Sequence, residues 1–368
     1  MKKLLSIFIT ALAIVAIAGC GPKESSKNTF EIAVVTDVGQ LHDGGFNEGT
    51  YNGAKEYAEA NNKTYKYYQP ANGADATDND RIAAMQQAIE NGARVIVTPG
   101  FLQAAAITSV ATENPDVKFI FVDGWALGLN NVTAISYKEE ESGYLAGYAV
   151  VKDGYTNIGG TFGGGGTNAA CNRFAYGYIQ GAEAAAAELD VTVNARVSFL
   201  YGSSFSASAE LQTQISGWYN DGVEVVFSCG GSMLQSVKSA AEETENGKIV
   251  GVDVDQASES PRVITSAVKG LTASVKKVLG EFYAGEWDTK LANQLSNLGA
   301  ADDATGLPTA TASWRFNSFT VTEYNTLFNN IKTGAVTIDN QTAENMNEEA
   351  AWASLVASLT HVNFRLIK

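Results

Sequence analysis

The chain has 368 residues, with 40 acidic against 25 basic side chains and a formal net charge of −15. A surface this acidic repels phosphate backbones, which excludes nucleic acid from the expected partners. The length exceeds one ordinary domain and suits two.

The first residues predict export and a lipid anchor. Two lysines precede an apolar run over residues 4–18, which is too short for a stable membrane span. The run ends in Ile17-Ala18-Gly19-Cys20, the order of an exported lipoprotein precursor. We expect a signal peptide over residues 1–19, acylation of Cys20 and a tether over residues 20–29, which would hold the protein on the extracytoplasmic face of the cell membrane. The alternative is a plain signal peptide with a coincidental cysteine.

The body of the chain alternates short β-branched runs with longer alanine-rich runs. Near-continuous apolar strands separated by helices are typical of a parallel sheet covered on both faces. In the first part of the chain the pattern predicts strands at residues 31–36, 65–69, 95–98, 118–122 and 132–136, and helices at 47–61, 77–91 and 102–114.

The same alternation of predicted strands and helices then begins again. It predicts helices at 140–152, 172–188, 207–221 and 233–243, and strands at 157–162, 196–201, 223–228 and 248–252. We expect a strand at 263–266 and a helix at 268–283 to return to the first unit, before a helix at 318–333 and a strand at 362–367. The predicted fold class is therefore α/β, with two doubly wound parallel-sheet lobes joined by a hinge of several crossings. One lobe would hold residues 30–137 and about 263–300, and the other residues 138–262 and about 301–368.

Polar, glycine and aromatic residues follow the predicted strands, where ligands of open α/β sheets bind. The candidate binding residues found in this way are Asp37, Phe46, Asn47, Asp123, Phe205, Gly230, Gly231, Asp253 and Lys269. The rings of Phe46 and Phe205 suit a planar heterocycle between them, and Asp253 with Lys269 suits vicinal hydroxyls. Two alternatives stay open, namely an ordinary βα loop capped by Asn47 and a purely structural Asp–Lys pair.

The sequence contains few residue patterns that would support catalysis or metal binding. The chain has two histidines, no Gly-x-Ser-x-Gly elbow and no zinc-like Cys/His spacing. The glycine run 163–166 lacks a Walker lysine, so a flexible turn is the better interpretation. We therefore expect no catalysis, no cofactor and no metal, with a carboxylate-pair hydrolase as the remaining enzyme alternative. Cys171 and Cys229 are either a disulfide or two buried thiols.

Several motifs resemble the basic membrane protein family of substrate-binding lipoproteins over roughly residues 30–340. The most specific is Gly251-Val252-Asp253-Val254-Asp255-Gln256 with Ser266 and Lys269, followed by Thr36-Asp37-Val38-Gly39 with Asp43 and Phe46-Asn47. Phe121-Val122-Asp123, Arg173-Phe174 with Gly177 and Gly181, and Gly230-Gly231 add weaker support.

The resemblance implies a type I periplasmic-binding-protein fold and nucleoside uptake with an ABC permease and its ATPase. By similarity, Asp37 and Asn47 would hydrogen-bond the base, with Phe46 on one face of it. Phe205 is our choice for the opposing ring, with Phe174 as the weaker candidate. The ribose hydroxyls would be held by Asp253 and Lys269, helped by Asp123 and the backbone at Gly230 or Gly231.

We therefore predict a substrate-binding lipoprotein of an ABC importer that binds a purine nucleoside between two closing lobes. The alternatives are the same fold binding a sugar or a signalling molecule, a surface hydrolase, or a surface interaction protein. The sequence leaves open the preferred nucleoside, the permease and the role of residues 341–368.

Overall fold

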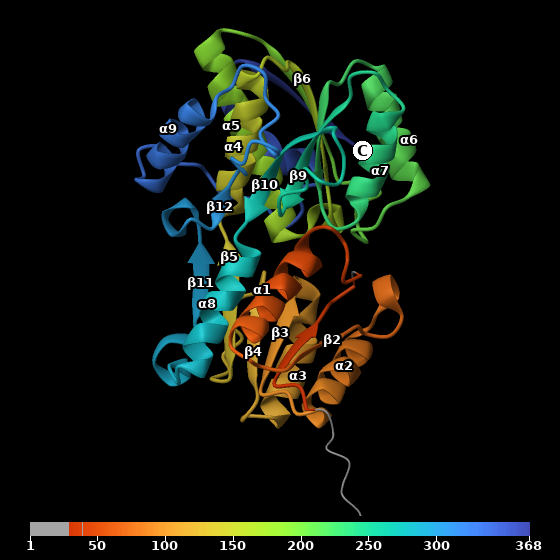
Figure 1. Ribbon diagram of the computed structural model, residues 1–368. Coiled ribbons are helices and arrows are strands. Elements are labelled where there is room, and N and C mark those ends of the chain that lie inside the picture. Colours follow the sequence, from red (N-terminus) through yellow and green to blue (C-terminus); the bar gives the residue numbers. More distant parts are fainter. Residues whose placement is uncertain (1–28, 39) are drawn as a thin grey trace, which may run out of the picture.

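The computed structural model describes residues 29–38 and 40–368, and these form two α/β lobes that lie end to end (Figure 1). Residues 1–28, with Cys20 and the expected signal peptide, lie outside the described residues. Within the described part of the chain, no helix has both the length and the apolar character needed to cross a bilayer.

The first lobe is built on a six-stranded parallel sheet in the order β11-β5-β4-β3-β1-β2. Its strands are β1 (Ile32–Val35), β2 (Tyr65–Tyr68), β3 (Val95–Pro99), β4 (Lys118–Val122), β5 (Val132–Tyr137) and β11 (Leu295–Leu298). Its helices are α1 (Phe46–Ala60), α2 (Asp78–Glu90), α3 (Ala104–Glu113) and α8 (Leu271–Tyr283). Alternate residues of β1 pack toward α1 and α8 on one face and toward α2 and α3 on the other. The unbroken apolar run of β1 is therefore buried on both sides, as the sequence pattern predicts.

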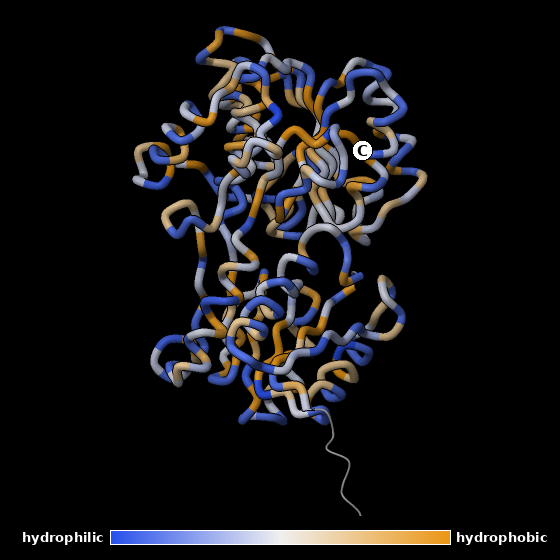
Figure 2. The backbone as a smooth tube through the Cα atoms, in the orientation of Figure 1, coloured by the Kyte–Doolittle hydropathy of each residue, from blue (hydrophilic) through white to orange (hydrophobic). Residues whose placement is uncertain are grey.

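The second lobe has a seven-stranded sheet in the order β12-β10-β9-β8-β6-β7-β13, parallel except for β12. Its strands are β6 (Asn157–Phe162), β7 (Val193–Ser198), β8 (Val225–Cys229), β9 (Lys248–Asp253), β10 (Val263–Lys269), β12 (Thr305–Gly306) and β13 (Val362–Ile367). Its helices are α4 (Glu139–Lys152), α5 (Ala169–Leu189), α6 (Ala209–Asn220), α7 (Met233–Glu242), α9 (Val321–Lys332) and α10 (Ala353–Ser358). Helices α4 and α5 cover one face of this sheet, and α6 and α7 cover the other. The expected two-lobe α/β architecture is thus confirmed (Figure 2 shows the apolar residues gathered along the strands).

Glycines let α4 and α5 pack at very short range. A Cβ added to Gly147 would lie 1.9 Å from the carbonyl oxygen of Tyr178. A β-carbon at that distance overlaps backbone atoms, so only glycine allows this contact. The backbones of α4 and α5 therefore pack directly against each other on one face of the second sheet.

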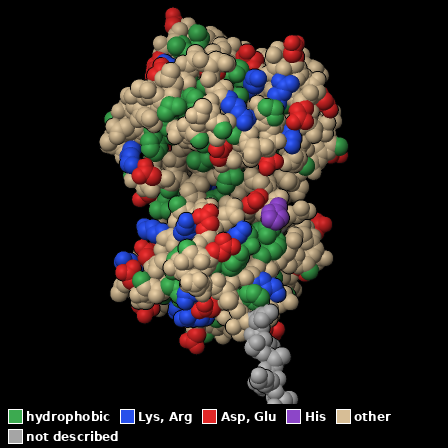
Figure 3. All heavy atoms as spheres, viewed as in Figure 1, with side chains coloured by type: hydrophobic (Ala, Val, Ile, Leu, Met, Phe, Trp, Pro, Cys, Tyr) green, Lys and Arg blue, Asp and Glu red, His purple; other side chains and the backbone are tan. Residues whose placement is uncertain are grey.

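The chain crosses between the lobes three times, from β5 to α4, from β10 to α8 and from β11 to β12. The second crossing lies later than expected. The strand at 263–266 was expected to return to the first lobe, but β10 pairs with β9 in the second sheet, and the chain returns only after Lys269. An apolar strand fits either sheet equally well, so hydropathy alone could not assign β10 to its partner. Figure 3 shows the resulting waist between the lobes, with acidic and basic side chains spread over both.

Candidate ligand-binding site

A cavity of about 280 Å³ lies between the two lobes, at the carboxyl ends of the strands of both sheets. All ten candidate residues from the sequence line it, namely Asp37, Phe46, Asn47, Asp123, Phe174, Phe205, Gly230, Gly231, Asp253 and Lys269. The parallel sheets explain this meeting, because each sheet presents all its strand ends on one edge.

The loop before α1 fixes the first two cavity residues of that helix. Gly45 has no side chain to cap the helix, and the carboxylate of Asp43 replaces it by accepting the backbone N–H groups of Gly45, Asn47 and Glu48 at 2.9, 3.0 and 3.2 Å. Burial raises the pKa of Asp43 to about 6 although these hydrogen bonds favour the carboxylate. Phe46 and Asn47 thus start the helix at a defined position, and the buried Oδ1 of Asn47 accepts no hydrogen bond from the described residues.

Asp37 occupies space that a glycine leaves open. Gly100 follows β3 with φ of +101°, and a Cβ at this position would lie 1.9 Å from Oδ2 of Asp37. The Asp37 side chain is buried in the cavity wall. The absence of a side chain at residue 100 therefore determines where this carboxylate lies.

A buried charge cluster lies at the centre of the cavity wall. Nζ of Lys269 is 2.7 Å from Oδ2 of Asp123, which follows β4 in the first lobe, and 3.2 Å from Oδ1 of Asp253, which ends β9 in the second. A third carboxylate, that of Glu139, is 3.9 Å from the same ammonium. Lys269 thus joins carboxylates of both lobes at the residue where the chain leaves β10.

Burial and charge compete within this cluster. Burial disfavours the charged form of Lys269, but Asp123, Asp253 and Glu139 together raise its pKa well above the usual range. Burial raises the pKa of Asp253, while Lys269 lowers it. Oδ1 of Asp123 is buried and accepts no hydrogen bond within the described residues. The cluster therefore holds a protonated amine together with an acceptor atom that a ligand hydroxyl could fill.

Aromatic rings enter the cavity from both lobes. The ring of Phe46 lies 4.7 Å from Nζ of Lys269, and Phe205 contacts Phe101 of the other lobe edge-on, with centroids 6.4 Å apart. Phe174 is only 1% exposed and packs against Phe227 on the inner side of the wall. Phe46 and Phe205 are thus the partly exposed candidate rings, and Phe174 lies deeper.

The glycine run 163–166 shapes the site as well as the turn. A Cβ on Gly163 would lie 2.4 Å from Cδ1 of Phe205, and a Cβ on Gly230 would lie 3.1 Å from the same atom. The flexible-turn interpretation missed this role, because a glycine run does not reveal which ring packs against it. Glycine at these two positions leaves room for the ring of Phe205.

Three cavity residues other than glycine have left-handed backbones. The φ angles are +56° at Asp123, +57° at Phe205 and +68° at Asp253. Aspartate tolerates this region better than most residues, whereas for phenylalanine it is an outlier. Strained backbone of this kind is concentrated at functional sites.

Comparison with known protein families gives a match over residues 30–350 to the family described as Bmp, "ABC transporter substrate-binding protein PnrA-like". The chain belongs to this family. It is therefore an ABC transporter substrate-binding protein, and the family is one of extracytoplasmic binding proteins, not of enzymes. The resemblance seen in the sequence is confirmed.

Individual relatives agree with this assignment. The chain is 29% identical to the ABC transporter nucleoside-binding protein BmpA of Lactococcus lactis over 314 residues, which cover 78% of this chain and 86% of that protein. It is 25% identical to basic membrane protein B of Borreliella burgdorferi, over 83% of this chain and 88% of the relative.

Solved structures confirm the type I periplasmic-binding-protein fold. An ABC transporter solute-binding protein from Aeropyrum pernix matches with a TM-score of 0.71 and 18% identity, covering 90% of this chain and 97% of the other. One from Conexibacter woesei matches with a TM-score of 0.64 and 20% identity, covering 85% and 99%. At these identities the likeness shows the fold alone.

Sequence reasoning missed several residues around this Bmp-family site. The cavity is also lined by Gln69, Phe101, Asn168 and Ser206. Phe101 and Asn168 follow β3 and β6, so a complete survey of strand ends could have found them. Glu139 and Arg173 lie behind the wall, inside helices, where a charged residue normally indicates a solvated face.

Both cysteines in the described residues are free and buried, and both line the cavity. Sγ of Cys171 lies 3.9 Å from the carbonyl oxygen of Cys229. Of the two possibilities left open by the sequence, the structure has the pair of buried thiols.

Proposed function

We propose that this Bmp-family protein captures a purine nucleoside for an ABC importer. The observation that carries the proposal is one cavity that combines two rings from opposite lobes with a carboxylate–ammonium–carboxylate cluster. The rings suit a flat base, and the cluster suits the hydroxyls of a ribose. The similarity to a relative named as nucleoside-binding supports the same ligand class.

In this proposal the base lies between Phe46 and Phe205. Asn47 and Asp37 lie at the Phe46 end, where the unpartnered Oδ1 of Asn47 and the carboxylate of Asp37 accept N–H groups of the base. A purine offers such donors on its edge, and the geometry would favour it over a bare sugar.

The sugar would lie at the charge cluster. Ribose hydroxyls donate to Asp123 and Asp253, and they accept from Lys269. Hydrogen bonds to charged groups in a closed cavity contribute about 1.5–3 kcal/mol each. Gly230 and Gly231 let the backbone approach the same region of the ligand.

The proposal includes delivery at the membrane. An acylated Cys20 would hold the lobes near an ABC permease on the outer face of the membrane, with residues 20–29 as the tether. Mass spectrometry of the protein extracted from membranes would test this, because a Cys20→Ala variant should lack the lipid and appear in the soluble fraction.

The first experiment is calorimetric titration of ligand-stripped residues 28–368 with adenosine, guanosine, inosine, cytidine, uridine and ribose. We expect tight one-to-one binding of the purine nucleosides and weak binding of ribose. Asp253→Asn should weaken purine nucleoside binding by roughly tenfold or more, and Asp221→Asn, on an exposed carboxylate paired with Arg196, should not. Ribose binding as tightly as inosine, or a folded protein that binds none of the six, would contradict the proposal.

A further inference from the structure

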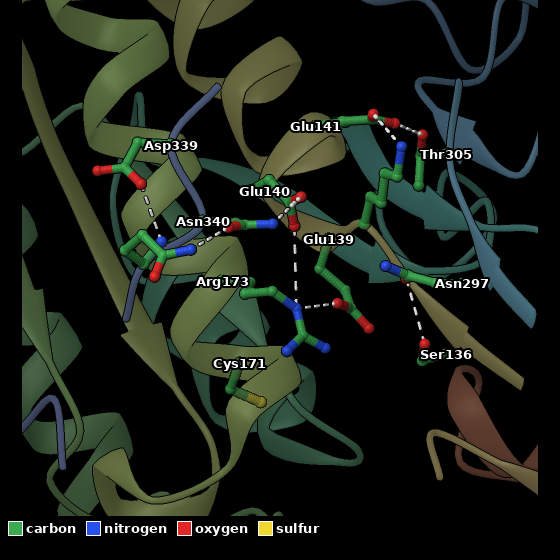
Figure 4. A network of polar contacts seen from close by, with 12 residues as sticks. Ser136, Glu139, Glu140, Glu141, Cys171, Arg173, Asn297, Thr305, Asp339 and Asn340 are labelled. Atoms are coloured by element: carbon green, nitrogen blue, oxygen red, sulfur yellow. Dashed lines mark hydrogen bonds and ion pairs between the residues drawn. The ribbon is translucent and has the colours of Figure 1, made fainter. Parts of the chain in front are cut away.

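Two charged residues contact the binding cluster from outside the cavity. Glu139 begins α4, directly after the first crossing between the lobes, and its side chain is fully buried. Arg173 lies on α5, and neither residue lines the cavity. Figure 4 shows Arg173 between Glu139 and Glu140, with Nε 2.6 Å from Oε2 of Glu139.

Glu139 competes with Asp123 and Asp253 for the ammonium group of Lys269. Its Oε1 atom lies 3.9 Å from Nζ of Lys269 and accepts no hydrogen bond from the described residues. A buried, partly unpaired carboxylate at this distance attracts an ammonium strongly, because little solvent screens the pair. The short contact with Arg173 occupies the other oxygen of Glu139.

The segment after α9 supports the same arrangement. Nδ2 of Asn340 donates to Oε1 of Glu140 at 3.3 Å, and Oε2 of Glu140 lies 3.8 Å from Nε of Arg173. Asp339 is held by reciprocal hydrogen bonds between its backbone and the side chain of Gln180, at 2.8 and 3.0 Å. Arg173 therefore lies between two fixed carboxylates and has little freedom to leave Glu139.

We propose that Arg173 is a positioning residue for ligand hydroxyls, which acts by keeping Glu139 at 3.9 Å from Lys269 and preventing a closer contact. With Glu139 held, the ammonium stays between Asp123 and Asp253, the two carboxylates that face the cavity. Without Arg173, Glu139 would take the ammonium and draw it out of reach of the ligand. This inference rests on the proposed function, because it assumes that the hydroxyls of a nucleoside meet Lys269.

The test compares two ligands that differ only in the hydroxyls. Inosine and 2′,3′-dideoxyinosine are titrated into the wild type, R173M, R173M/E139Q and R196M. R173M should bind inosine roughly tenfold more weakly, with little change for the dideoxy ligand. R173M/E139Q should regain the wild-type preference for inosine, because the competing carboxylate is gone.

R196M is the matched control. Arg196 has the same kind of partner, a carboxylate at 3.1 Å, and its side chain is 20% exposed against 24% for Arg173. It lies on β7 and does not line the cavity. R196M should therefore keep both affinities.

The outcomes separate this inference from the proposed function. A wild type that binds neither ligand would overturn both. A wild type that prefers inosine, with R173M losing affinity equally for both ligands or for neither, would overturn the positioning role alone. Thermal unfolding checks that R173M is folded. If it is not, R173M/E139Q decides the matter, because it removes both charges of the Arg173–Glu139 pair while Glu140 keeps its hydrogen bond from Asn340. A lost preference for inosine in a folded sample of that variant would refute the inference.

Discussion

Replacement of Gly100 by alanine should test whether the Asp37 carboxylate binds the base of the ligand. The new Cβ would lie 1.9 Å from Oδ2 of Asp37, far inside contact distance, so the carboxylate must move. A hydrogen bond to a charged group is worth about 1.5–3 kcal/mol, which corresponds to a loss of affinity of roughly 10- to 150-fold. Calorimetric titration with inosine measures this loss directly.

Gly128→Ala is the control for backbone strain. Gly128 also has a positive φ, +76°, but an added Cβ meets nothing within 4 Å. Gly128→Ala should lose about 1–2 kcal/mol of folding stability from its positive φ, and Gly100→Ala at least as much, as measured by urea unfolding. Only Gly100→Ala should lose affinity. Wild-type affinity in Gly100→Ala, or an equal loss in Gly128→Ala, would refute the role given to Asp37.

Three further predictions concern stacking, packing and titration. Phe205→Ala should weaken binding of purine nucleosides by about 1–3 kcal/mol and leave ribose binding unchanged; equal losses for both ligands in a titration would contradict the stacking role. Gly147→Ala should destabilise the fold by about 1–3 kcal/mol, since its Cβ would meet the Tyr178 carbonyl, whereas Gly217→Ala, on an exposed helical face, should not lower the urea midpoint. Burial raises the pKa of Glu139 from 4.5 to about 7 against the opposing effect of Arg173, so this group stabilises the fold below pH 4.5 and loses that contribution as pH rises through 7. The unfolding free energy of Glu139→Gln relative to the wild type should therefore rise by roughly 1–3 kcal/mol across that range, and parallel pH profiles would contradict it.

The sequence was most informative where burial and local capping determine structure. The run that became β1 is fully buried, and Thr77 caps α2 through a capping box with Asp80. The hydropathy pattern placed β7 wrongly, at 196–201 instead of Val193–Ser198, because the exposed Asn194 interrupts the apolar pattern of this strand. It also gave no means of choosing a sheet for β10, since strand partners are selected in three dimensions.

The cavity lining followed from one topological rule, because the ends of parallel strands share an edge. That rule brought Asp37, Asp123 and Asp253 together without any distance information. It could not find Glu139, which contacts Lys269 from the start of α4, or the pairing of Arg173 on α5 with Glu139. Their pairing depends on how α4 and α5 pack, and single-sequence patterns carry no information about that contact.

The left-handed backbones at Asp123, Phe205 and Asp253 determine which substitutions a selection for stability would favour. Each such residue costs about 1–3 kcal/mol that glycine would avoid. A selection for heat resistance alone would therefore favour glycine at these three positions and remove two carboxylates and a ring from the cavity. Thermostable descendants of this protein should keep their fold while becoming poor receptors, unless each round of selection also demands the ligand.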